Sequence, residues 1–94
     1  MKKKYTSFGF SLPLSQIQKN QYVQILSIPN SNIRLQAIRL GMTEGSCIFC
    51  LEKLHHGPVV VLIENQQVAI GYFLAQSIRT IPIKASFSKI GGLK

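Results

Sequence analysis

Short apolar runs bounded by turn-forming residues make up most of this sequence and restrict it to a small antiparallel β fold. The runs are rich in β-branched and aromatic residues, and they predict strands at residues 22–28, 46–54, 59–64, 68–72 and 78–83. No two of them are separated by the long helical pattern that a βαβ unit requires. We therefore expect an all-β fold, a small β-barrel with one or two short helices.

The length and apolar content of the chain limit it to one domain. It has 94 residues, of which 46% are hydrophobic, enough for a single core. The longest apolar run, Val59–Ile63, is far shorter than the roughly 20 residues of a membrane-crossing helix, and residues 5–14 are too interrupted for a secretory signal. We expect a cytoplasmic domain at residues 12–83, an N-terminal arm at 1–11 that is mobile or loosely docked, and a basic C-terminal tail at 84–94.

Residues 33–40 are predicted to form a short helix. Asn30 and its neighbours offer side-chain oxygens suited to the N-cap, and the helix has two apolar stripes. The stripe expected to face the core contains Ile33, Ala37 and Leu40. The second stripe contains Leu35 and Ile38, flanked by Arg34 and Arg39. A helix on a small barrel needs one stripe for its own core, so the second is covered either by the N-terminal arm or by another protein.

The turn Leu40–Gly45, which follows this helix, has two glycines with a structural role. Gly41 allows the helix to end in a left-handed conformation, and Gly45 allows the chain to reverse into the next strand. A second turn, which contains Gly57 and Pro58, joins the next two strands into a hairpin.

The predicted strand Val59–Ile63 is apolar on both faces. An antiparallel strand with one face in water alternates apolar and polar residues, so the outer face of this strand is expected to be covered. A tail of the chain, a second subunit of a homo-oligomer and a partner protein are the alternatives.

The chain is strongly basic. Eleven Lys and Arg residues against three glutamates give a formal net charge of +8. Much of this charge lies near the two ends, at Lys2, Lys3, Lys4, Lys84, Lys89 and Lys94. Basic ends favour solubility, and they also attract acidic partners, of which nucleic acid, an anionic membrane surface and an acidic protein face are the candidates.

Cys47 and Cys50 have the spacing of a redox motif or of half a zinc site. On a strand, residues three apart point to opposite faces, so these thiols can neither bind one ion together nor form a relaxed disulfide. His55 and His56 lie in a predicted turn, where one of them with Glu52 or Cys50 would form a weak metal site. A plain exposed turn is the preferred interpretation.

Catalytic residues are not predicted. The sequence has no Asp and only three glutamates, so carboxylate pairs are scarce, and it has no phosphate-binding loop. The predicted strands are nearly uncharged, which argues against a nucleic-acid platform of interleaved aromatic and basic residues. We predict no enzyme activity, no metal site and no cofactor, and a function in binding a partner.

Five segments, taken together and in order, carry a family resemblance. They are Leu12–Ile17, Val23–Ile28, the turn Leu40-Gly41-Met42-Thr43-Glu44-Gly45, Gly57–Val61, and Val68–Ile70 followed by Ala75 and Ile78. The chain from about residue 12 to 83 thereby resembles the FeoA family, small cytoplasmic SH3-like barrel proteins of bacterial ferrous iron uptake. Glu44 stands where the family often has proline, Asn20 where it often has glycine, and Gly71 where it tends to have a basic or polar residue.

The resemblance implies an SH3-like barrel that binds and modulates the membrane GTPase transporter FeoB. We predict that the partner-binding surface is formed by Arg34, Leu35, Ile38, Arg39 and Met42, with peripheral contact to an anionic membrane from the basic ends. The same barrel occurs as the C-terminal domain of metal-dependent repressors, so a regulatory or nucleic-acid-associated barrel is one alternative. A small iron-binding protein that uses Cys50, Glu52, His55 and His56 is the second.

Overall fold

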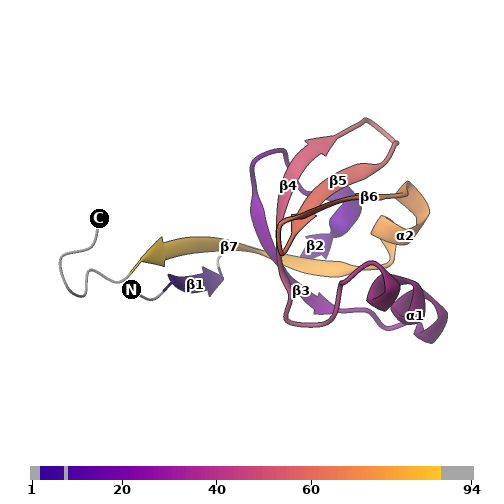
Figure 1. The fold of residues 1–94 in the computed structure, drawn as a ribbon, viewed down its shortest axis with the longest axis horizontal. Coiled ribbons are helices and arrows are strands. Elements are labelled where there is room, and N and C mark those ends of the chain that lie inside the picture. Colours follow the sequence, from indigo (N-terminus) through magenta and orange to yellow (C-terminus); the bar gives the residue numbers. More distant parts are fainter. Residues whose placement is uncertain (1–2, 8, 88–94) are drawn as a thin grey trace.

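Antiparallel strands form one curved sheet in the computed structural model of this chain, which describes residues 3–7 and 9–87 (Figure 1). The strand order is β1-β7-β3-β4-β5-β6, and β2 pairs with β7 outside this path. The strands are β1 (Lys3–Ser7), β2 (Leu12–Pro13), β3 (Tyr22–Ser27), β4 (Cys47–Lys53), β5 (Val59–Ile63), β6 (Gln66–Ile70) and β7 (Arg79–Phe87). The helices are the 3-10 turn η1 (Leu14–Gln16), α1 (Ser31–Arg39) and α2 (Tyr72–Gln76).

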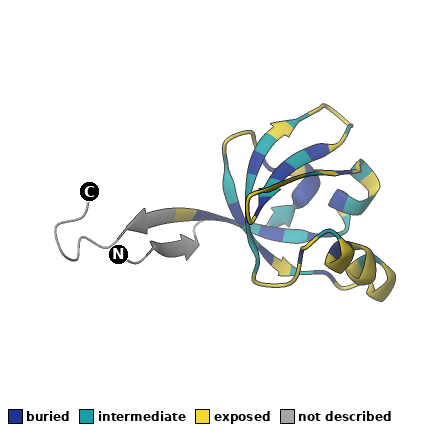
Figure 2. Cartoon of the chain, viewed as in Figure 1, coloured by how far each residue is buried: buried dark blue, intermediate teal, exposed yellow. Residues whose placement is uncertain are grey.

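The sheet closes around one hydrophobic core. Burial alternates along β3, β4 and β5, as the two-residue period of a strand requires, and the buried faces point inward (Figure 2). Helix α1 contributes Ala37, α2 contributes Ala75 and η1 contributes Leu14, all fully buried. The predicted fold class, an all-β barrel with short helices, is confirmed.

The turn between β5 and β6 differs from the prediction. Glu64 and Asn65 have φ angles of 48° and 69°, which makes them the two central residues of a tight hairpin turn. Gln66 and Gln67 therefore pair with Ile63 and Leu62 of β5, where the sequence predicts a turn. As a result β6 ends at Ile70, and the end of the predicted strand 68–72 instead begins α2.

Strand β7 is longer than the predicted strand at 78–83. Up to Pro82 it pairs with β3, and from Ile83 to Phe87 it pairs with β1. The predicted N-terminal arm thus contains a strand, and the first residues of the predicted basic tail continue β7. Residues 1–2, 8 and 88–94, which belong to the predicted arm and tail, lie outside the described residues.

The outer face of β5 is covered only in part. Val60 and Leu62 are half-buried, in contrast to the buried residues on either side of them. Leu62 lies opposite Phe49 of β4, and the ring of Phe49 packs against that of Tyr22 in β3, with centroids 4.7 Å apart and planes tilted by 55°. Neighbouring side chains of the same sheet therefore supply part of the expected cover. Within the described part of the chain, neither helix is long and apolar enough to cross a membrane.

The turn at Glu64 predicts a stabilising substitution. A side chain in the left-handed region costs about 1–2 kcal/mol, except that Asn tolerates this region well. We expect Glu64→Asn to raise the free energy of unfolding by roughly 0.5–1 kcal/mol, as measured by urea denaturation.

Glu64→Gln is the matched control, because it removes the same charge and retains an unfavourable side chain at positive φ. Its stability should stay close to that of the wild type. Equal stabilisation by both variants would attribute the effect to charge and contradict the backbone explanation.

Candidate functional site

The outward face of α1 is the candidate functional site. Leu35 and Ile38 are 58% and 49% exposed, although both are large apolar side chains. Ile33 and Leu40 pack against the core around the buried Ala37, so the helix has the two stripes that the sequence predicts. Figure 2 shows α1 as the most exposed regular element of the barrel. The described strand of the N-terminal arm lies at the other end of the molecule and does not cover this face (Figure 1).

The start of α1 is held by Asn30. Its side-chain oxygen accepts hydrogen bonds from the backbone N–H groups of Asn32 at 2.9 Å and Ile33 at 3.1 Å. These are the second and third residues of the helix, whose N–H groups have no partner within the helix. The cap therefore sets where the helix begins.

The end of α1 is a Schellman motif. Gly41, at φ +90°, donates its N–H to the Ile38 carbonyl, and Met42 donates its N–H to the Ala37 carbonyl, both at 2.9 Å. This motif commonly brings the residue after the glycine into apolar contact with the last turn of the helix. Met42 and Ala37 both lie in the core cluster with no exposed area.

Met42 is therefore not part of the outward face, contrary to the prediction from sequence. The left-handed residue Gly41 reverses the chain so that the following side chain points back under the helix, into the barrel. The outward face of α1 consists of Arg34, Leu35, Ile38 and Arg39, and we call these residues the α1 face.

Two side chains attach α1 to the end of β3 through one buried residue. The Arg34 Nε donates to the Ile28 carbonyl at 3.1 Å, and the Ile28 N–H donates to a Glu44 carboxylate oxygen at 3.2 Å. Ile28 is fully buried just after β3, where sheet pairing no longer satisfies its backbone. The two bonds orient both the helix and the turn after it. They also give Glu44 a structural role at a position where the family often has proline.

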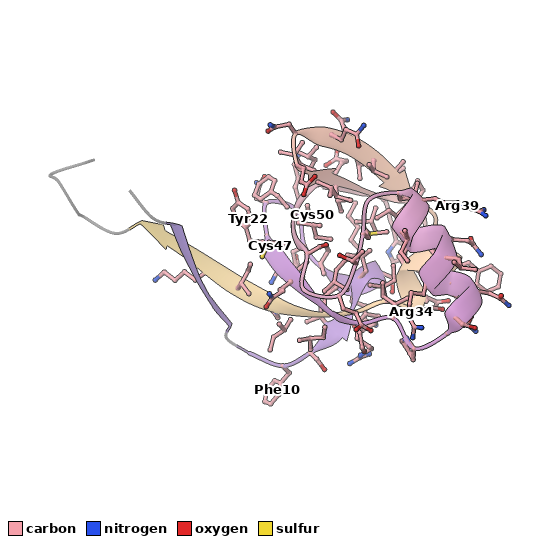
Figure 3. All side chains as sticks on the ribbon, turned by 60° about the horizontal axis from the view of Figure 1, so that its bottom comes forward. Phe10, Tyr22, Arg34, Arg39, Cys47 and Cys50 are labelled. Atoms are coloured by element: carbon pink, nitrogen blue, oxygen red, sulfur yellow. The ribbon has the colours of Figure 1, made fainter. Side chains whose placement is uncertain are left out.

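The α1 face is apolar at its centre and positive at its edges. Arg34 and Arg39 extend from the helix on either side of its length (Figure 3), and the first turn contains no acidic residue. Arg39 lies in the last turn, where a cation is favoured by the helix dipole. This combination fits a partner surface that is apolar with carboxylates at its rim.

The two cysteines lie on opposite faces of β4, as the spacing predicts. Cys50 is fully buried with Ile48, whereas Cys47 lies on the outer side with Phe49 (Figure 3). Burial raises the pKa of the Cys50 thiol above its ordinary value, and a contact with the Glu52 carbonyl at 3.6 Å only partly offsets this effect. A buried thiol of raised pKa is unsuited to metal binding or redox exchange.

The residues considered for a metal site meet only in pairs in the part of the chain that the structure describes. His55 and His56 lie in the turn between β4 and β5, their rings 4.0 Å apart, and His56 faces the ring of Tyr72 at the start of α2. Over the residues that the structure describes, no group of three or more His, Cys, Asp and Glu side chains is placed to hold a metal ion.

Two phenylalanines are strongly exposed, and neither belongs to the surface predicted from the sequence. Phe10, before β2, is 90% exposed, and Phe73 of α2 is 87% exposed. Figure 3 shows Phe10 pointing away from the barrel. Composition alone does not distinguish these positions from buried ones, because exposure depends on how the preceding turn directs the side chain.

Comparison with known families decides the assignment. The FeoA domain matches residues 12–81. This chain belongs to the FeoA domain family. Membership implies involvement in ferrous iron transport, and the match extends over almost all of the barrel. No protein of curated function matches the sequence.

Solved structures agree with this family. An iron uptake regulatory protein, FeoA, superposes with a TM-score of 0.73 at 26% identity, over 78% of this chain and 99% of that one. A FeoA-like protein from Clostridium acetobutylicum has a TM-score of 0.65 at 14% identity, over 86% and 93%. A manganese-dependent transcriptional repressor has a TM-score of 0.66 at 17% identity, but only 41% of its chain is matched. The SH3-like barrel is thus confirmed, and the likeness to the repressor shows the fold alone.

One departure from the family pattern has a simple structural reason. Asn20 stands where the family often has glycine, and its φ is 69°. Asn is the residue other than glycine that most readily adopts this left-handed conformation, so the turn before β3 is retained.

The helix end predicts a specific loss of stability. At Gly41 an added Cβ would meet Ile63 at an ordinary contact distance of 3.8 Å, so the cost of Gly41→Ala comes from its φ of +90°. We expect a loss of about 1–2 kcal/mol in the free energy of unfolding. Gly71→Ala, in open space at a φ of −61°, should leave stability nearly unchanged. Similar losses in both variants would contradict this account.

The cysteines are expected to react with alkylating reagents at different rates. Cys47 should be modified first in the folded protein, because Cys50 is buried and its pKa is raised. Mass spectrometry of peptides after a short iodoacetamide pulse measures both sites, with the urea-unfolded chain as control. Earlier labelling of Cys50 in the folded protein would contradict its burial.

Proposed function

We propose that this protein acts in ferrous iron uptake by binding the cytoplasmic part of the membrane GTPase transporter FeoB through the α1 face. The observation that carries the proposal is the exposure of two large apolar side chains, Leu35 and Ile38, one turn apart on a helix whose other stripe is already used by the core. A helix with a second apolar stripe is suited to a groove on another protein.

The rigidity of α1 supports this proposal. The Asn30 cap, the Schellman motif and the Arg34 bond to Ile28 hold the helix at both ends and along its side. A partner that binds a preformed helix loses little conformational entropy in ordering it. The α1 face is therefore a prepared surface rather than one that must fold on contact.

The chemistry of the α1 face suggests the chemistry of its partner. Complete burial of an exposed Leu or Ile contributes up to roughly 1.5–3 kcal/mol. Both residues are about half-exposed, so burial of each against a partner would contribute part of this free energy. Arg34 and Arg39 would pair with carboxylates at the edge of the groove, which favours rapid and correctly oriented association. The site on FeoB should thus be an apolar depression with an acidic rim.

The proposed action is modulation of the transporter rather than catalysis by this chain. Binding energy at the α1 face can shift FeoB between conformations only to the extent that the face binds one of them better. The corresponding readouts are the GTP hydrolysis rate of FeoB and ferrous iron uptake, each measured with and without this protein.

Co-purification with detergent-solubilised FeoB tests the proposal. Leu35→Glu and Ile38→Glu each place a charge in the centre of the α1 face, and we expect each to lower the affinity at least tenfold, about 1.4 kcal/mol. Both positions are exposed, so the barrel should remain folded, which circular dichroism verifies.

Leu54→Glu is the matched control. Leu54 is 54% exposed, close to the value for Leu35, but it lies in the turn after β4, away from α1. FeoB should bind this variant as it binds the wild type. Equal recovery of Leu35→Glu and wild type would exclude the α1 face as the docking site, and equal loss in Leu35→Glu and Leu54→Glu would show a non-specific effect.

A further inference from the structure

The two ends of the chain meet in a ribbon that projects from the barrel. β1 pairs antiparallel with the last five residues of β7, from Ser7 opposite Ile83 near the barrel to Lys3 opposite Phe87 at the far end (Figure 1). The molecule is accordingly elongated, with extents of 44 × 26 × 26 Å. We call residues 3–7 and 83–87 the terminal ribbon.

Strand pairing gathers the positive charge of the chain at this ribbon. Between residues 9 and 82 the basic residues are nearly balanced by the three glutamates, which all lie between residues 44 and 64. The basic residues of that part are Lys19, Arg34, Arg39, Lys53 and Arg79. The other six of the eleven are Lys3, Lys4 and Lys84 in the terminal ribbon and Lys2, Lys89 and Lys94 beyond its strands in the sequence. The described chain therefore has a nearly neutral barrel and three lysines in the terminal ribbon.

The terminal ribbon is two strands wide. β1 is the last strand of the sheet, and β7 has no pairing with β3 beyond Pro82, so in the described chain both outer edges of the ribbon are unpaired. A two-stranded ribbon that stands alone in water is marginally stable. A surface that neutralises its lysines would stabilise it.

We propose that the terminal ribbon is a membrane-binding element that docks on anionic phospholipid headgroups. Clusters of lysines bind such a surface, at about 1 kcal/mol for each Lys or Arg that reaches it, which corresponds to roughly a fivefold gain in the binding constant per residue.

The observations favour a bilayer over the two alternative partners, a second copy of this chain and nucleic acid. A second copy pairing through the ribbon would bring lysines against lysines, which is electrostatically unfavourable. Nucleic acid would satisfy the charge, but the family assignment links this chain to ion transport across a membrane, and the likeness to the repressor shows the fold alone. The choice of a membrane thus rests on the proposed function.

The placement of the ribbon is compatible with transporter binding. The ribbon and α1 lie at opposite ends of the molecule (Figure 1). A protein docked on the membrane through the terminal ribbon would therefore leave the α1 face free for FeoB in the same membrane. Binding of the ribbon to the membrane would raise the effective concentration of the α1 face near FeoB.

Binding of the full chain to lipid vesicles tests this proposal. We expect the protein to sediment with vesicles that contain phosphatidylglycerol and to dissociate from them as the salt concentration is raised. It should not sediment with vesicles of pure phosphatidylcholine. Lys4→Gln/Lys84→Gln should lower the binding constant about 25-fold, the product of two fivefold losses. The pairing of Thr6 with Lys84 places both positions on the same face of the ribbon.

Lys19→Gln/Lys53→Gln is the matched control, because it changes the net charge equally at the barrel, where Lys19 pairs with Glu52 at 3.2 Å. Its binding constant should fall less than fivefold. Absence of binding to phosphatidylglycerol vesicles, or an equal loss in the two double variants, would overturn the proposal. Displacement of the protein from vesicles by a DNA duplex at equal phosphate concentration would also overturn it, in favour of nucleic acid.

This outcome is separable from that of the transporter experiment. The FeoB co-purification uses detergent and no bilayer, so Lys4→Gln/Lys84→Gln should bind solubilised FeoB like the wild type, while Leu35→Glu should bind vesicles like the wild type. A loss of both activities in either variant would contradict the assignment of two independent surfaces.

Discussion

The reversal of the chain at Gly41 is the constraint on which the arrangement of the site depends. A helix of nine residues on a small barrel has little intrinsic stability, and its orientation is decided at its ends. The two hydrogen bonds of the Schellman motif end α1 and direct Met42 into the core, and Glu44, two residues later, accepts the N–H of Ile28. Because Arg34 binds the carbonyl of the same residue, the helix and the turn are attached to β3 at one point.

The division of α1 into two apolar stripes follows from this attachment. The core has room for one stripe, since the barrel already contains buried side chains from β3, β4, β5 and β6. The second stripe is left in water with arginines beside it, and no described segment of the chain packs over it. The barrel is thus a rigid support for a helix face. In the proposed function, the apolar interior of the barrel supplies stability and the helix supplies the contact with the partner.

The molecule is organised along its long axis, with an apolar face on α1 at one end and positive charge at the other. Charge of one sign destabilises a compact fold through self-repulsion. The pairing of β1 with β7 places Lys3, Lys4 and Lys84 on a projection away from the barrel, where water and salt screen their mutual repulsion. The two proposals place long-range electrostatic attraction and short-range apolar contact on separate surfaces.

The sequence by itself determined the features that depend on local chemistry. Strands β3, β4 and β5, the cap at Asn30, the opposite faces of Cys47 and Cys50, and the two stripes of α1 all follow from side-chain period or from the conformational preferences of single residues. The tertiary structure alone decided that Met42 is buried, that Gln66 and Gln67 belong to β6, and that the ends of the chain pair with each other. Each of these depends on what lies across space, such as the space beneath a helix or a partner strand from the other end of the chain. The pattern of hydrophobic residues along the sequence does not show which segments lie across space from one another. The same side chain can be exposed or buried, depending on those neighbours.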